Sequence, residues 1–213
     1  MRAVSELGPG FALAVVYLGA GGGIYERAFA DTLLFPRLLD AIRDRLAGTA
    51  GAPTTFSAVY LSAFSAGYGA VRAIVSNDAL SARLAGVLLL DGMHVSYVPE
   101  RMVLFDGGAL DTVGMAPFVR LARRAVNGDV RFIVTHSEIF PGTFASTTET
   151  ADYLLQAVGV ARLPMLQVGP VGMQQTSEAT RGRFTLRGFA GNSAPDHLDH
   201  LHGIPGFLPL LFQ

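Results

Sequence analysis

The sequence predicts a three-layer α/β/α sandwich built around a mainly parallel β-sheet. Short runs that are apolar throughout alternate along the chain with longer stretches of helical period. Strands of that kind are typical of a parallel sheet covered by helices on both faces. The 213 residues are 50% hydrophobic and only 15% charged, a composition that supplies one sizeable core. The chain shows neither an internal repeat nor a linker, so we expect residues 1–213 to form one domain.

Five runs have the length and composition of buried strands, because they are short, apolar and rich in β-branched or aromatic residues. They are Phe11–Leu18, Phe56–Phe64, Ala85–Leu90, Val130–Thr135 and Arg183–Phe189. The stretch Arg162–Gly182 fits the alternation poorly. We expect it to be a loop, with a short extra strand as the alternative.

Four segments between these runs carry apolar residues at helical spacing. They are Asp31–Leu46, Ala66–Val75, Met115–Val126 and Ser146–Val158. The last segment opens with the sequence STTE, in which Ser146 and Glu149 would satisfy each other's backbone donors as a capping box.

The charge balance argues against two classes of partner. The formal net charge is -1, so electrostatics gives no case for nucleic acid or for an anionic membrane surface. The absence of cysteine excludes disulfides and thiolate metal sites. The apolar run FALAVVYLGA is too short for a membrane span, and no basic region precedes an apolar one. We expect a cytoplasmic protein, although a leader removed during maturation would leave no trace in this chain.

Ser65 lies where the predicted strand ends and the next helix begins, in the stretch FSAVYLSAFSAGYGAVRAIV. The carboxyl ends of the strands are where a doubly wound sheet carries its chemistry. A turn this tight forces unusual backbone angles on its apex and crowds the positions two before and two after it. Ala63 and Gly67 supply small residues there. The alternative is that Ser65 only caps the helix that follows.

This strand–turn–helix stretch resembles the nucleophile elbow of the α/β-hydrolase superfamily, whose usual form is Gly-x-Ser-x-Gly. Ala63 stands where the first glycine is usual. The resemblance implies that Ser65 is a nucleophile, and that an acid and then a histidine follow it along the chain. A serine hydroxyl needs such partners, because it is a poor nucleophile until a base takes its proton.

The predicted base lies in the tail GNSAPDHLDHLHGIPGF, where the superfamily places its histidine. We favour His197, at the junction of loop and helix, because a loop position lets the imidazole reach across to Ser65. His200 is the rival. We expect His200 and His202 to lie on a partly solvated helix face.

Two residues are candidates for the acid. Asp91 ends the strand GVLLLD, one strand over from Ser65, so its carboxylate would emerge at the same edge of the sheet. Glu138 follows the next strand, which is the more common place in the superfamily. We favour Asp91, as in some lipases of this superfamily; its alternative role is to brace a loop beside Gly92.

Acyl transfer also requires backbone donors aimed at the developing oxyanion. The amide of Ala66 is one candidate, at the positive end of the following helix. The loop YLGAGGG looks like the "His-Gly" loop of these hydrolases, with Leu18 or Gly19 in the histidine position. From it we favour the amide of Ala20, with Gly19 or Gly21 as alternatives.

Glycine-rich turns after a first strand are also typical of phosphate binding. The dinucleotide fingerprint fails here, because Ile24 or Glu26 stands where its third glycine is required, and no P-loop Lys-Ser/Thr follows. Phosphate or nucleotide binding by the loop Gly19–Gly23 is therefore the weaker hypothesis.

A metal site is conceivable from ligand type alone, because His94, His136 and Glu138 also follow predicted strands. Among the histidines that could join them, only His197 and His200 have tight helical spacing. We expect no metal and no cofactor.

The resemblance implies a serine hydrolase that cleaves a carboxylic ester or a related acyl bond, in a small or polymeric substrate. A non-catalytic α/β scaffold is the other alternative. Two departures from the superfamily are visible: only one helix separates the first apolar run from the nucleophile strand, and two opening antiparallel strands have no room before Phe11. The chain would be a reduced form, similar in size to cutinases.

Overall fold

The computed structural model describes residues 10–50 and 55–213. Its centre is a six-stranded sheet with the strand order β1-β2-β5-β8-β7-β6. The strands β1, β2, β5 and β8 are parallel neighbours, whereas β7 and β6 are antiparallel. Their bounds are β1 Val59–Phe64, β2 Leu84–Leu90, β5 Arg131–His136, β6 Leu163–Val168, β7 Gln174–Arg181 and β8 Phe184–Phe189.

The four parallel strands are the ones that the last four predicted runs indicated, with ends that differ by at most three residues. The prediction of a loop over Arg162–Gly182 was wrong, because β6 and β7 occupy most of that stretch. In β7 buried and exposed side chains alternate, since one face packs on the core. The buried positions are small or polar, so the strand carries no apolar run that would mark it.

The prediction of a strand over Phe11–Leu18 was also wrong. These residues form no strand in the structure, and their side chains are largely exposed, with Val15 at 81% and Tyr17 at 82%. At the start of the segment the ring of Phe11 meets that of Phe212, from the other end of the chain, at a centroid distance of 4.9 Å. Strand-forming composition is not sufficient, because a strand also needs a partner for its backbone hydrogen bonds.

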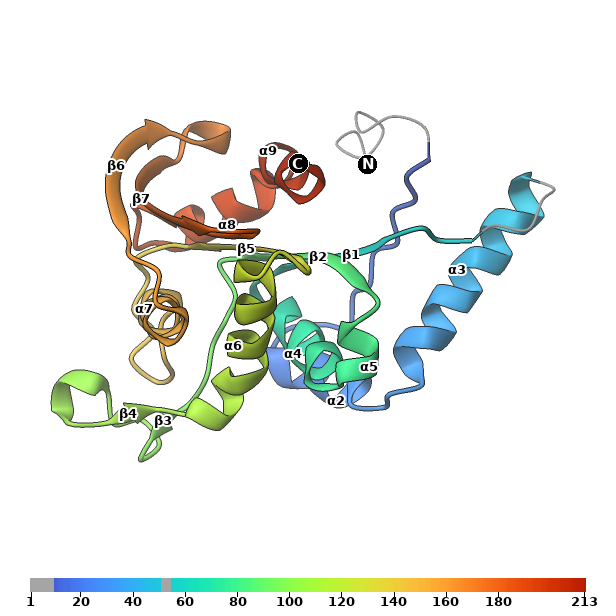
Figure 1. The fold of residues 1–213 in the computed structure, drawn as a ribbon. Helices are drawn as coiled ribbons and strands as arrows, with labels where there is room; N and C mark the ends of the chain where they lie inside the picture. Colours follow the sequence, from blue (N-terminus) through green and yellow to red (C-terminus); the bar gives the residue numbers. More distant parts are fainter. Residues whose placement is uncertain (1–9, 51–54) are drawn as a thin grey trace.

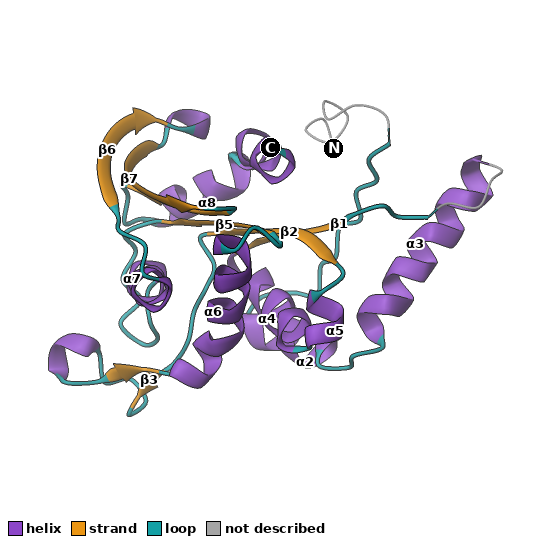
Figure 2. Cartoon of the chain, in the orientation of Figure 1, coloured by secondary structure: helices purple, strands orange, loops and turns teal. Residues whose placement is uncertain are grey.

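Helices lie on both faces of the sheet, as the sequence predicted (Figure 1). Seen nearly edge-on, the sheet has α2, α4, α5, α6 and α7 on one side and α8 and α9 on the other (Figure 2). The helix bounds are α2 Gly22–Phe29, α3 Leu34–Ala50, α4 Tyr68–Ser76, α5 Asp78–Ser81, α6 Thr112–Val126, α7 Thr147–Val158, α8 Ala194–His202 and α9 Ile204–Phe207. The predicted capping box of Ser146 and Glu149 is confirmed, with Ser146 as the N-cap of α7.

A small hairpin, which the sequence analysis did not predict, stands away from the sheet (Figure 1). Its strands, β3 (Tyr97–Val98) and β4 (Ala109–Leu110), are antiparallel and follow the loop after β2. The hydroxyl of Tyr97 donates to Glu149 at 2.8 Å, which ties the hairpin to the start of α7.

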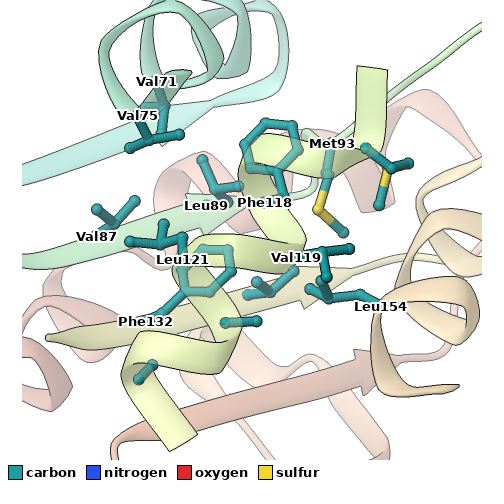
Figure 3. Packing of buried hydrophobic residues seen from close by; sticks show 14 of the residues in the cluster. Val71, Val75, Val87, Leu89, Met93, Phe118, Val119, Leu121, Phe132 and Leu154 are labelled. Carbon is teal, nitrogen blue, oxygen red and sulfur yellow. The ribbon is translucent and has the colours of Figure 1, made fainter. Parts of the chain in front are cut away.

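Two hydrophobic clusters fix the layers. The larger one packs β2 and β5 against α4, α6 and α7; the side chains of Val87, Leu89, Phe118 and Phe132 point toward one another there (Figure 3). The smaller one lies on the other face, where alternate residues of the same strands meet the C-terminal helices. Within the described ranges, none of the helices is long and apolar enough to cross a membrane.

Candidate active site

Ser65 lies at the sharp bend between β1 and α4. The strand ends at Phe64, a single 3-10 turn covers Ser65–Gly67, and α4 begins at Tyr68. The φ angle of Ser65 is +49°, a left-handed conformation that residues other than glycine rarely adopt. Strain of this kind costs on the order of 1–3 kcal/mol and persists only where the surrounding structure imposes it.

Close backbone packing imposes this bend. A Cβ atom added to Gly67 would lie 3.2 Å from the Cβ of Ala63, and one added to Gly92 would lie 2.3 Å from the carbonyl oxygen of Ser65. A side chain at position 67 would therefore be crowded by Ala63, which agrees with the predicted need for small residues on both sides of Ser65. Gly92, in the loop after β2, is equally required, because any side chain there would collide with the backbone of the elbow.

Three side chains from three elements form one hydrogen-bonded chain at this edge. The Oγ of Ser65 lies 2.9 Å from Nε2 of His197, and Nδ1 of His197 lies 2.7 Å from Oδ2 of Asp91. An ionised carboxylate only accepts hydrogen bonds, so Nδ1 of His197 carries the proton and Nε2 accepts from Ser65. The N-cap of the 3-10 turn is Phe64, and the hydroxyl of Ser65 bonds His197. The structure thus brings together the three residues predicted as nucleophile, acid and base.

Asp91 is 2% exposed and, like Ser65, has a positive φ, here +42°. Burial alone would raise the pKa of its carboxyl, but the hydrogen bond from His197, the electrostatic interaction with His200 and hydrogen bonds from Ser137 and Thr147 together outweigh burial and hold the pKa well below its usual range. The carboxylate is therefore ionised at neutral pH. An ionised partner on Nδ1 stabilises positive charge on His197 when the imidazole takes a proton.

The imidazole of His197 lies at the start of α8 and is partly open to solvent, with 27% of its side chain exposed. The ring of Phe64, directly before Ser65, packs against it at a centroid distance of 4.6 Å. The imidazole is thus held on one side by an apolar ring and at Nδ1 by a carboxylate.

The alternative acid and bases lie elsewhere. Glu138 is exposed, and its backbone amide donates to the carbonyl of Gly191 at 2.8 Å. The expectation of a solvated face was wrong for His200, which is 1% exposed and has Nδ1 2.7 Å from the hydroxyl of Thr135. The side chain of His202 is 63% exposed, as expected.

Two further histidines lie near this site. Nδ1 of His94 bonds the carbonyl of Ala145 at 2.9 Å, and its ring meets that of Tyr68 edge-on. His136 is buried at the end of β5, where its Nε2 accepts from Arg162 at 2.7 Å. Burial lowers the pKa of His94, and it lowers that of His136 to about 4. Within residues 10–50 and 55–213, no group of three or more His, Asp or Glu side chains is placed to hold a metal ion.

The loop expected to supply an oxyanion donor leads into α2, and α2 packs on the elbow and on α4. The contact is close: a Cβ on Gly69 of α4 would lie 2.1 Å from the carbonyl oxygen of Gly22. Arg72 of α4 also forms an ion pair with Glu26 of α2. Ala20 lies in this loop and Ala66 in the turn after Ser65; the role of their amides as donors stays a prediction.

The sequence did not predict the contact of Gly92 with the elbow, the packing of Phe64 on His197, or the roles of Ser137 and Thr147 as donors to Asp91. Ser137 directly follows β5, at the same sheet edge as Asp91, so the reasoning from strand ends that identified Asp91 could also have identified Ser137. Thr147 was visible only as part of a capping box. No family model, curated protein or solved structure matches this chain.

Proposed function

We propose that this protein is a serine hydrolase that cleaves a carboxylic ester, or a related acyl bond, through an acyl-enzyme on Ser65. The observation that carries the proposal is the hydrogen-bonded chain from Ser65 through His197 to the ionised Asp91. A serine hydroxyl, an imidazole with a free acceptor nitrogen and a buried carboxylate in this order form the arrangement that activates a hydroxyl for acyl transfer.

In the first half of the reaction the Oγ of Ser65 attacks the acyl carbon, and its proton passes to Nε2 of His197. The bond to the leaving alcohol then breaks, and His197 returns the proton to the alcohol oxygen. In the second half a water molecule attacks the acyl-enzyme, with His197 again taking and then returning a proton. Asp91 keeps the imidazole in the required tautomer and offsets its positive charge in both halves.

Negative charge develops on the acyl oxygen in each half. We propose that the amides of Ala66 and Ala20 hold it. The support for Ala66 is its place in the first turn after Ser65, where backbone amides have no partner within the helix. The support for Ala20 is the packing of α2 on the elbow, which brings the Gly19–Gly21 loop to the same side of the molecule as Ser65.

We further propose that the chain is a reduced member of the α/β-hydrolase superfamily. The strained elbow, the chain order Ser65, Asp91, His197 and the parallel strands β1, β2, β5 and β8 support this assignment. The ring of Tyr68 packs on Gly22, so the glycine-rich loop serves close packing of helices here. That packing favours acyl transfer over the phosphate-binding hypothesis.

Turnover of a panel of p-nitrophenyl esters tests the proposal. Ser65→Ala should lower kcat/KM by at least about 10³-fold, because the other members of such a triad act only through the nucleophile. Ser62→Ala is the matched control: Ser62 is an exposed serine of the same strand, and turnover should be unchanged. Equal turnover in folded Ser65→Ala and wild-type protein would contradict the proposal and leave a non-catalytic scaffold.

A further inference from the structure

The carboxylate of Asp91 receives hydrogen bonds on both oxygens. Oδ2 accepts from Nδ1 of His197 at 2.7 Å and from Oγ of Ser137 at 2.7 Å. Oδ1 accepts from the backbone amide of Ser137 at 2.9 Å and from Oγ1 of Thr147 at 2.7 Å. Two donors on each oxygen leave the carboxylate little freedom to rotate.

Apart from His197, the donors come from two parts of the chain that carry none of the three triad residues. Ser137 directly follows β5, the neighbour of β2, and Asp91 directly follows β2; the amide of Asp91 donates to the carbonyl of Thr135 at 3.0 Å. Thr147 is the first residue of the 12-residue helix α7, so Asp91 also lies at the positive end of that helix. Ser137 and Thr147 are 1% and 4% exposed, so water does not compete for these bonds.

We propose that Ser137 and Thr147 are positioning residues, which set the orientation and charge of Asp91 and thereby the basicity of His197. The proposal rests on the proposed function. Oδ2 is shared between Ser137 and His197, so the hydroxyl of Ser137 acts on the oxygen that orients the imidazole. Thr147 holds the other oxygen and prevents the carboxylate from turning away.

The direction in which the pH profile should move follows from how the donors share the negative charge of the Asp91 carboxylate. Each donor withdraws negative charge from the carboxylate, so removal of a donor leaves more charge facing His197. The protonated imidazole is then stabilised, and the pH at which the base loses its proton rises. The freed carboxylate also holds the ring less well, so turnover falls.

Within the part of the chain that the structure describes, three more histidines interact electrostatically with this pair: His94, His136 and His200. They lie on the loop after β2, on β5 and on α8. Burial lowers the pKa of all three, so they stay neutral where an ordinary imidazole takes a proton.

The test compares Ser137→Ala and Thr147→Val with wild-type protein. We expect kcat/KM for a p-nitrophenyl ester to fall by about tenfold, the effect of losing one hydrogen bond to a charged group, and the acid limb to move to higher pH. Thr147→Ser keeps a hydroxyl and should restore both values. Thr150→Val is the matched control, since its buried hydroxyl lies in the same helix and bonds backbone carbonyls, among them that of Met93 at 2.6 Å.

Proton NMR of the His197 ring gives a readout that does not depend on activity. Its titration should move to higher pH in Ser137→Ala and Thr147→Val, and stay unchanged in Thr150→Val, even if no ester is cleaved. A titration and an acid limb equal to those of the wild type in both variants would overturn the positioning role, whatever their stability. If no form of the protein, the wild type included, cleaves an ester, but the His197 titration still moves in the two variants, the proposed function alone would be overturned.

Discussion

At the scale of single residues, the two candidate acids, Asp91 and Glu138, differ in burial and in their contact with His197. Asp91 is buried and bonded to His197, whereas Glu138 is exposed. Asp91→Asn should lower kcat by about 10³- to 10⁴-fold, because an amide at that position favours the wrong imidazole tautomer. Glu138→Gln should leave kcat within about twofold, the range expected for an exposed side chain outside the site. Steady-state ester hydrolysis by the two variants provides the measurement, and a larger loss in Glu138→Gln would refute the assignment of the acid.

The residues of the predicted triad were accessible from the sequence, because strand ends mark one edge of a parallel sheet. Asp91 and Ser65 both end strands, and His197 follows the last one. The burial of His200 could not be predicted from the sequence, because its helix has an amphipathic pattern. Only the structure shows that Phe189 and Phe207 pack against its ring. The donors Ser137 and Thr147 were hidden by their ordinary local roles, a residue after a strand and a residue in a cap.

At the scale of elements, the packing of α2 on α4 and on the elbow fixes α2 and with it the loop that leads into α2. A methyl group on Gly69 would lie 2.1 Å from the carbonyl oxygen of Gly22, which is backbone and has little room to yield. Gly69→Ala should therefore destabilise the protein by about 1–3 kcal/mol, as overpacking does, and lower ester turnover by displacing the Gly19–Gly21 loop. Urea unfolding and kcat/KM measure the two effects.

Gly48→Ala in α3 is the matched control for Gly69→Ala. Among the described residues, and apart from the backbone of its own helix, no atom lies within 4 Å of the added Cβ, so alanine should raise the free energy of unfolding by up to about 1 kcal/mol through its better helix propensity. Turnover should stay the same. Equal stability changes of the two variants would show that the α2–α4 contact is looser than the structure has it.

The sequence predicted correctly those strands that combine an apolar run with a neighbouring strand to pair with. Strands β2 and β5 are buried on both faces, so an apolar run is enough to identify them. Strand β7 was missed because its buried side chains are small or polar, such as Ser177 and Ala179. The segment Phe11–Leu18 was wrongly predicted for the opposite reason: it has the composition of a strand, but among residues 10–50 and 55–213 it pairs with no strand that would complete its hydrogen bonds.

At the scale of the whole molecule, His136 is a buried titratable residue of the central sheet. Its strand β5 lies between β2 and β8, and its ring accepts a hydrogen bond from Arg162. Burial lowers the pKa of His136 to about 4, below the usual value of about 6.5 that the unfolded chain retains. Between these two values the unfolded state binds a proton that the folded state does not. The free energy of unfolding should therefore fall as the pH drops from about 6.5 to about 4, by roughly 3 kcal/mol for this residue.

Urea unfolding across this pH range, in the wild type and in His136→Gln, checks the effect. The variant should lose part of the pH dependence, and the rest belongs to His94 and His200, whose pKa values burial also lowers. His202→Gln, at an exposed position of α8, should keep the slope of the wild type. A slope in His136→Gln as steep as in the wild type would contradict the buried, neutral state of His136.

The fold brings residues that lie 132 and 106 positions apart into one chain of hydrogen bonds, and the central claim is that this chain makes the Ser65 oxygen a nucleophile. Covalent labelling by a fluorophosphonate, followed by peptide mapping, tests that claim most directly. We predict one modified residue, Ser65, and a sharply reduced labelling rate in His197→Ala. Well-folded protein that takes up no label, or that carries it on another serine while Ser65 stays unmodified, would contradict the account.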